Sequence, residues 1–402
     1  MLTAYRIKGS RFYNPLLYFF VAWLIVLFAY HLYWSDLLPI MTVSILFFIV
    51  FTLLVSLLFF FFSPRLSFVF QIDSQKELYK LKVSFILTFI LFLTEAFSAK
   101  SFPLLDILLG RLSYGDFGLP FVHVIYYAYS SVCCSLAFLY YNLTSNKKFL
   151  KYVFLFLSPG VLIVTRSYIM YNLVYLIIIY FSSSFINLNK KKKIKSIIVF
   201  SVRLSAVVLI FGIVGEVRST SGLEKSTEKY IYIISKPNKN FGNKNPLLLW
   251  VYCYITTPLG NLINTINSPI ESPLTNISDL DALFFINLPD LVNKRVFNLT
   301  RSVNLVVPYF NVSTNYAISY IYLGMFGLYY SFFTILLWVI VIYKLKRNNI
   351  YSFLSFIYLG TILFFNIFTN MFNFMGLCPQ LWLALLLMFS KDIKFLIVGR
   401  KS

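Results

Sequence analysis

Ten apolar runs divide this sequence, and they constrain its fold more than any other feature. Several reach about 18 residues, the length that an α-helix needs to cross a bilayer core of about 30 Å. Hydrophobic residues make up 59% of the chain and charged residues only 12%, about half the charged fraction of an average soluble domain. The sequence therefore predicts an integral membrane protein. The runs lie at about 14–34, 41–62, 83–99, 121–143, 152–164, 167–186, 196–215, 317–343, 351–368 and 380–390.

Lysine and arginine are distributed unevenly between the breaks that separate these runs. If the N-terminus is cytoplasmic, the inner breaks carry 22 of them, whereas the short outer breaks carry only Lys100, Arg111 and Arg166. Cytoplasmic loops of membrane proteins have this excess, and it sets their orientation. Orientation and contact with anionic lipid explain the inner clusters without a further function. The pattern predicts an all-α membrane protein with about ten transmembrane helices and both termini in the cytoplasm.

A long polar segment interrupts the alternation after the seventh run. The charge pattern places it outside, so the chain divides into residues 1–215 with seven helices, a large periplasmic loop over 216–316, and residues 317–402 with three helices and a cytoplasmic tail. A loop of this length in a compact protein is usually functional or disordered, and its many aromatic residues argue against disorder. We therefore expect it to contribute to the site.

One part of this loop, residues 246–263, is apolar enough to form an eleventh helix. A crossing there would move the basic cluster at 344–347 to the outside and break the charge pattern. Pro258 and Gly260 are also expected to interrupt a helix. We predict a re-entrant or interfacial segment.

Charge and motifs exclude several function classes. The net charge is +21, but the basic residues lie between apolar runs and not on one soluble face, which argues against nucleic acid as a partner. The sequence contains no nucleotide-binding glycine motif and no convincing spacing of metal ligands. We expect neither a nucleotide nor a metal, and no other cofactor.

The arginines on the outer side are the strongest candidates for a binding site. Arg166 opens a helix after a short turn, and Arg218 follows the last apolar turn of another run. A guanidinium group matches phosphate oxygens bidentately and keeps its charge near lipid. Together these two arginines are suited to a lipid-linked pyrophosphate. The alternative is that each one only anchors a helix end among lipid headgroups.

Few residues of the outer half can act as an acid or base. His123 lies near the outer start of the fourth run, and Glu95 near the outer end of the third. Either can serve as a general base, as can Glu216 at the start of the loop. The alternative for His123 is an ordinary interfacial residue, and for Glu95 a solvated carboxylate at a helix end or a partner for an arginine.

Four short stretches resemble the O-antigen or oligosaccharide repeat-unit polymerases, the Wzy family of bacterial inner-membrane proteins. They are VTRSYIMYNLVYLIIIY at 164–180, GEVRST at 215–220, YCYITTPLGNLIN at 252–264 and STNYAISYIYLGMFGLYY at 313–330. The last contains a Gly-x-x-Gly pair, Gly324 and Gly327. An Arg-x10-Gly pattern described in some members is absent, and Tyr322 stands where an acidic residue is common.

This resemblance implies a membrane glycosyltransferase bundle of the GT-C-like type, with its active site facing the periplasm. It implies an undecaprenyl-pyrophosphate-linked glycan as donor and a lipid-linked repeat unit as acceptor, as in O-antigen, lipopolysaccharide or capsule biosynthesis. Membrane lipids, a chain-length regulator and a flippase are the further partners we expect. The expected catalytic residues are Arg166, Arg218 and Glu216. The expected substrate-binding residues are Arg111, Arg295, Arg301, Tyr254, Asn261 and His123.

Two alternatives stay open at this point. A glycan ligase would share the frame and the chemistry but transfer the glycan to a different acceptor. A flippase for lipid-linked oligosaccharides would also be a basic, aromatic-rich bundle, but it would usually have short loops and paired halves.

Overall fold

The structure is a computed structural model of the 402-residue chain. It describes residues 3–108, 117–183, 189, 191–192, 194–195, 230–242, 245–268, 279–290, 292–293 and 303–398. The predicted helix at 196–215 lies outside these residues, as does most of the loop on either side of its described helices.

The described chain is mostly helical, and nine of its helices occur where the apolar runs predict them. These are α1 (Pro15–Tyr30), α2 (Val43–Phe62), α3 (Ser74–Ala99), α5 (Pro120–Thr144), α6 (Lys148–Leu162), α7 (Arg166–Ser183), α13 (Asn315–Lys344), α14 (Ile350–Phe365) and α15 (Cys378–Val398). The other helices are α4 (Pro103–Leu108), α9 (Tyr230–Ser235), α10 (Pro246–Asn267) and α11 (Asp279–Asn287).

Among the described residues, five helices are long and apolar enough to cross a membrane by length and composition: α2, α3, α5, α10 and α13. Four shorter apolar stretches lie in α1, α7, α14 and α15. The structure therefore supports a helical protein embedded in a membrane. The number of crossings and the side that each terminus faces stay predictions.

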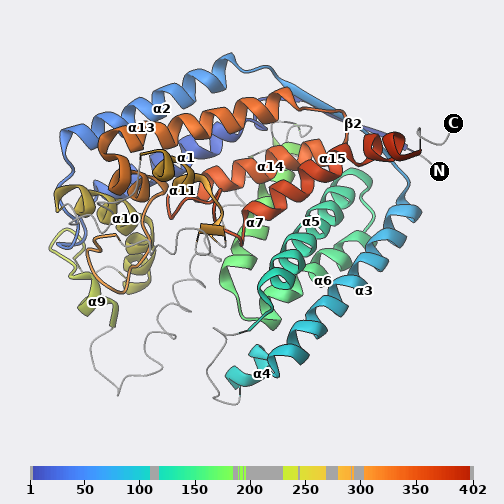
Figure 1. Ribbon diagram of the computed structural model, residues 1–402, viewed down its shortest axis with the longest axis horizontal. Helices are drawn as coiled ribbons and strands as arrows, with labels where there is room; N and C mark the ends of the chain where they lie inside the picture. Colours follow the sequence, from blue (N-terminus) through green and yellow to red (C-terminus); the bar gives the residue numbers. More distant parts are fainter. Residues whose placement is uncertain are drawn as a thin grey trace.

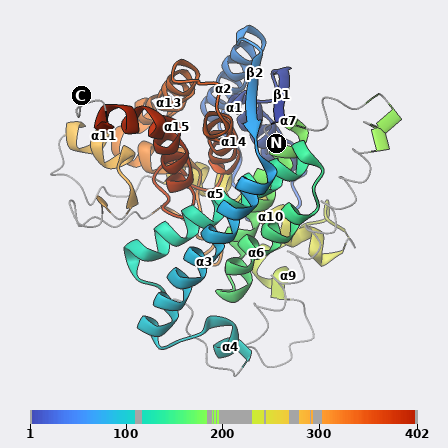
Figure 2. The ribbon, with the colours of Figure 1, turned by 90° about the vertical axis from the view of Figure 1, so that its right-hand side faces the viewer.

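The helices form two groups that share a middle layer. Figure 1 shows α1, α2 and α13 side by side in one half and α3, α5 and α6 in the other, and the turned view in Figure 2 keeps the same division. Helices α14 and α15 lie between the groups, where α14 packs against α1 and α15 against α5. A small apolar cluster around Phe92, Tyr126 and Tyr168 lies within the second group, apart from the main core.

The connection between α6 and α7 is the tight hairpin that the sequence predicts. Only three residues, 163–165, separate the two helices. Gly160 allows them to meet closely, because a Cβ there would lie 2.6 Å from Cγ1 of Ile169. Val164 takes a positive φ of 57°, and the Thr165 amide donates to the Gly160 carbonyl at 2.9 Å. This geometry fixes where Thr165 and the start of α7 lie.

The hydropathy pattern does not predict the small antiparallel sheet formed by β1 (Thr3–Ser10) and β2 (Leu66–Ile72). Alternate residues of β2, among them Phe68 and Phe70, are buried, which is the two-residue period of a half-buried strand. Both rings pack edge-on against Phe353 of α14. Figure 1 shows this sheet at the end of the molecule where α15 also ends.

The predicted interruption of a helix at Pro258 and Gly260 is wrong. Helix α10 runs unbroken through both residues. A proline in a helix removes one hydrogen bond, and packing on both sides can hold the helix together despite that loss. Leu259 and Leu262 are fully buried next to the proline. Whether α10 crosses the membrane or lies at its surface stays a prediction.

Helix α13 is broken near its start, although the sequence predicts one continuous helix over 317–343. Gly324 has φ 56° and ψ −144°, a conformation that is essentially restricted to glycine. The chain turns back there, since the hydroxyls of Ser319 and Ser331 are hydrogen-bonded although twelve residues separate them. A Cβ on Gly327 would overlap the Ser319 carbonyl oxygen. The Gly-x-x-Gly pair therefore makes a sharp turn, with one glycine for its φ angle and one for close backbone contact.

Candidate functional site

The two ionisable residues Glu95 and His123 form a pair between the ends of α3 and α5. The side chain of Glu95 is fully buried, and its Oε2 lies 3.0 Å from Nδ1 of His123, whose side chain is 26% exposed. The other carboxylate oxygen, Oε1, is buried and has no hydrogen-bond partner among the described residues. A buried acid inside a membrane bundle is costly and is by default a functional candidate.

The local sequence brings the histidine to the acid. Gly118, just before α5, has a positive φ of 107°, and a Cβ there would lie 2.7 Å from Nδ1 of His123. Helix α5 then begins at Pro120, a residue well suited to the first turn of a helix. The imidazole thus lies one turn into α5, against the last turns of α3.

Aromatic side chains hold the ring of His123 from the other side. The ring centroid of Tyr127 is 4.2 Å from that of His123, and Phe117 packs edge-on at 6.3 Å. The Tyr127 hydroxyl lies 2.6 Å from the Thr165 hydroxyl in the α6–α7 turn. The pair is therefore connected through one tyrosine to the turn that precedes Arg166.

A cavity of about 280 Å³ opens beside His123. Its walls come from α5, from the α6–α7 turn, from α7 and from the segment between α14 and α15. The lining residues are His123, Val124, Tyr127, Thr165, Ser167, Tyr168, Tyr171, Phe374, Met375 and Gly376. The volume is close to the lower end of the range for small-molecule sites, about 300 Å³.

Arg166 lies at the rim of this cavity as judged from the backbone. It is the first residue of α7, and its neighbours Thr165 and Ser167 both line the cavity. The position of its guanidinium group lies outside what the structure describes. The backbone alone brings the predicted phosphate-binding arginine and the candidate base to one cavity.

The pair has a defined chemistry. An ionised carboxylate can only accept hydrogen bonds, so Nδ1 of His123 must donate to Glu95 when the acid is charged. The remaining nitrogen, Nε2, is then an acceptor. A histidine oriented in this way by a carboxylate is the usual arrangement of a general base.

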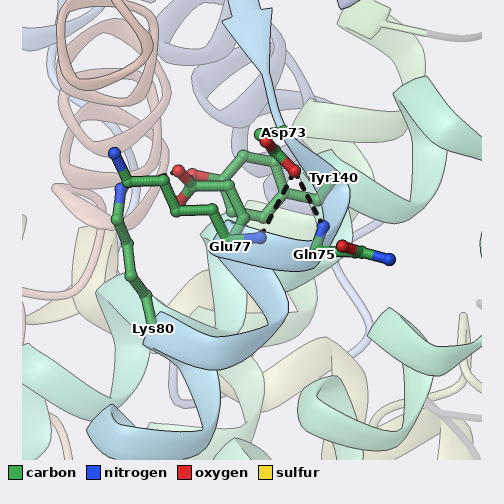
Figure 3. A network of polar contacts seen from close by, with 6 residues as sticks. Asp73, Gln75, Glu77, Lys80 and Tyr140 are labelled. Atoms are coloured by element: carbon green, nitrogen blue, oxygen red, sulfur yellow. Dashed lines mark hydrogen bonds and ion pairs between the residues drawn. The ribbon is translucent and has the colours of Figure 1, made fainter. Parts of the chain in front are cut away.

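A second acid on α3, Glu77, provides a contrast at the opposite end of the helix, about 27 Å away at 1.5 Å per residue. Its Oε1 accepts from Lys80 Nζ at 2.6 Å and its Oε2 from the Tyr140 hydroxyl at 2.9 Å, so both oxygens have partners. Figure 3 shows these residues together with Asp73. Of the two acids, Glu95 alone has a buried carboxylate oxygen without a partner among the described residues, and its other oxygen contacts a residue that lines a cavity.

Asp73 in the same network has a structural role. Its carboxylate accepts from the backbone amides of Lys76 and Gln75 and caps α3. These hydrogen bonds, the one from Lys76 first, lower the pKa of Asp73 below its ordinary value. They stabilise the charged form, so the ionised acid caps the helix more strongly than the neutral acid.

Two of the predicted substrate-binding residues lie on α10 and not at this cavity. Asn261 is fully buried, and its amide donates to the carbonyls of Phe310 and Val312 at 2.8 and 2.7 Å. Its Oδ1 accepts from the Val306 amide at 2.7 Å. Because both amide hydrogens are used by the backbone, Asn261 fastens the segment before α13 and has no donor left for a substrate.

Tyr254, the other predicted residue on α10, packs between two aromatic rings. Its ring lies 6.1 Å from both Trp250 and Phe310. It is partly buried in the layer that α10 forms with the 303–314 segment. A contact with sugar at this position stays a prediction.

The remaining predicted site residues lie outside the described part of the chain. They are Glu216, Arg218, Arg111, Arg295 and Arg301. Within the described part, no group of three or more His, Cys, Asp or Glu side chains is arranged to hold a metal ion.

The pairing of Glu95 with His123 is the feature that sequence reasoning missed. The signal was present, because both residues lie at the facing ends of consecutive apolar runs joined by one break, which the charge pattern predicts to be an outer one. Consecutive helices place such ends on the same face of a membrane. Rotation about the two helix axes decides whether the side chains meet, and this requires the structure.

Comparison with protein-family models, curated proteins and solved structures gives no match for this chain.

Proposed function

We propose that this protein is a membrane glycosyltransferase that polymerises lipid-linked oligosaccharide repeat units at the outer face of the bacterial inner membrane. The observation that carries the proposal is the pairing of buried Glu95 with His123, which lines a cavity whose rim includes the backbone of Arg166. A base and a cation at one membrane cavity are what transfer from a lipid pyrophosphate needs.

The reaction follows from this arrangement. A hydroxyl of the acceptor sugar attacks the anomeric carbon of the donor glycan, and a new glycosidic C–O bond forms. His123 Nε2 takes the hydroxyl proton while Glu95 stabilises the imidazolium that results. The bond from the anomeric carbon to the pyrophosphate oxygen breaks, and undecaprenyl pyrophosphate leaves with the bonding electrons.

The leaving group needs stabilisation of charge more than a proton. Arg166, with Arg218 as its predicted partner, would bind the pyrophosphate oxygens as charge develops on them. Removing one such donor typically costs about 3–4 kcal/mol, or about a hundred- to a thousandfold in rate. Arg166→Lys keeps the charge but loses the bidentate fork, so glycan of wild-type length in that variant would argue against this role.

The aromatic wall of the cavity suits a sugar. Tyr171 and Phe374 both line it, and their ring centroids are 6.1 Å apart. Aromatic faces present an apolar surface to the C–H groups of a pyranose, and the polar residues Thr165 and Ser167 also line the cavity. A cavity of this size suits the reacting sugar residue, with the rest of the glycan outside it.

A flippase is the second candidate, and the same pair favours it. Chains of Asp, Glu and His inside a membrane bundle also form proton relays in pumps and transporters. A lipid-linked oligosaccharide transporter driven by protons would need a buried pair of this kind. A glycan ligase remains an alternative within the glycosyltransferase reading, since it shares the donor and differs in the acceptor.

Deletion of the gene separates the three functions. A strain without a polymerase makes surface glycan with a single repeat instead of a ladder on a gel. A strain without a ligase keeps polymerised glycan on the carrier lipid and has none on its final acceptor. A strain without a flippase retains single repeats on the cytoplasmic face. Only the first result supports the proposal, and either of the other two overturns it.

A further inference from the structure

A groove of about 360 Å³ lies between α2 and α13, and it shares no lining residue with the cavity at His123. Figure 1 shows these two helices side by side along one edge of the molecule. The groove lies at their C-terminal ends, next to the start of β2, where the basic breaks gather. It is the strongest feature of the described surface that the proposed reaction does not use.

The wall of the groove is apolar along its length. Phe59 and Phe62 of α2 face Ile340 of α13, and Phe62 and Ile340 are among the exposed large hydrophobic residues. The floor contains an edge-to-face ring pair, Phe59 with Tyr343 at 6.1 Å. Such a surface accepts a hydrocarbon chain and offers few hydrogen bonds.

The mouth of the groove is polar and positively charged. Lys344 lines it and is exposed, and Arg65 follows directly after the lining residue Pro64. Lys344 is one helical turn beyond Ile340, about 6 Å at 1.5 Å per residue. No carboxylate is among the residues that line the groove. A lysine one helical turn beyond an apolar slot matches the junction between a lipid phosphate and its acyl chain.

The neighbouring cations are engaged elsewhere. Lys346 lies over the Phe68 ring at 5.4 Å, and Arg347 lies over the Phe389 ring at 4.2 Å. These contacts hold the following segment against β2 and α15. Lys344 is therefore the cation that lines the groove itself, with the exposed Arg65 beside its mouth.

The geometry points to a binding site for one anionic glycerophospholipid, with its phosphate at Lys344 and the first part of one acyl chain between Phe62 and Ile340. The apolar slot adds contact with one acyl chain to the attraction that Lys344 has for an anionic headgroup. A lysine near an anionic membrane surface contributes about 1 kcal/mol, which corresponds to about a fivefold preference for anionic over zwitterionic lipid.

The test uses the full chain in nanodiscs and a tryptophan placed in the groove. Phe62→Trp introduces the reporter, and the five native tryptophans are subtracted with the unsubstituted protein. Discs contain zwitterionic lipid with about a tenth of either brominated phosphatidylglycerol or brominated phosphatidylcholine. Bromine quenches a tryptophan only on contact, so the ratio of the two quenching efficiencies measures headgroup selection at the groove.

We expect a ratio of about five in favour of phosphatidylglycerol, and a ratio near one when Lys344→Gln is added. Lys82→Gln is the matched control, since Lys82 is exposed on α3 and does not line the groove, and it should leave the ratio unchanged. A ratio near one without Lys344→Gln overturns the site, and so does a high ratio that survives this substitution.

Native mass spectrometry of the protein without the reporter gives a second reading if Phe62→Trp does not fold. Retained phosphatidylglycerol should fall about fivefold in Lys344→Gln and stay unchanged in Lys82→Gln. Equal retention in both variants overturns the site. Both measurements are independent of transferase activity, so their outcome does not depend on the proposed reaction.

Discussion

Replacing Glu95 by glutamine tests the role of the buried pair, because it removes the charge and keeps the shape and the acceptor oxygen. An imidazolium charge spread over its ring lies about 4 Å from the carboxylate charge, and at an effective dielectric constant of 20 their attraction is about 4 kcal/mol. His123 is partly exposed, so solvent screens part of this. We expect turnover to fall by about a hundred- to a thousandfold in Glu95→Gln.

The assay measures chain lengthening by purified protein in proteoliposomes supplied with lipid-linked repeat units. Because Glu95 acts on the base and does not reach substrate, kcat should fall while KM stays within about threefold. Glu77→Gln is the matched control on the same helix. Glu77 also binds a tyrosine hydroxyl, but it lies at the opposite end of α3, and its loss should leave kcat within about threefold.

Three outcomes would refute this reasoning. If Glu95→Gln keeps kcat within tenfold of the wild-type value, the carboxylate does not support a base. If Glu77→Gln loses as much activity, the effect of Glu95 is one of general stability. If KM rises while kcat is unchanged, the pair binds substrate and does not take part in the chemical step.

Three further predictions concern the frame of the site. Gly327→Ala should lower the free energy of unfolding in detergent by about 1–3 kcal/mol, because the added Cβ would overlap the Ser319 carbonyl. A melting temperature equal to that of wild type would contradict the turn at Gly324. Asn261→Ala should reduce the yield of folded protein without raising KM, since the substitution leaves three backbone groups of one segment without a partner. A raised KM at normal yield would instead support the predicted contact between Asn261 and substrate. Asp73→Ala should lower the melting temperature at neutral pH, and the difference from wild type should shrink as pH falls through the lowered pKa of Asp73, because the charged carboxylate caps the helix more strongly than the neutral acid. A difference of the same size in acid would mean that the cap does not depend on charge.

The positions of the helices were accessible from the sequence because lipid forces long apolar runs into helices. The short turn before Arg166 was equally predictable, and the structure confirms it. Prediction from the sequence failed where tertiary contacts override the local conformational preference of a residue. Helix α10 continues through Pro258 because buried leucines hold it on both sides.

Three features depended on geometry that no residue pattern contains. The sequence of helix α13 is one apolar run and predicts a continuous helix. The chain reverses inside it because Gly324 has non-helical backbone angles. Asn261 resembles a binding residue by type and position, yet its hydrogen bonds are all made to backbone groups forty-five or more residues away in the chain. Glu95 and His123 were each recognisable as candidates, and the 3.0 Å between them was not.

The central claim is that this membrane protein lengthens a lipid-linked glycan. The most direct measurement supplies the purified protein in proteoliposomes with a labelled lipid-linked repeat unit and resolves the products by size. We expect a ladder of longer glycans together with released undecaprenyl pyrophosphate. The His123→Ala variant should give no ladder. Label that crosses the bilayer while every glycan keeps a single repeat would contradict the claim and identify a transporter.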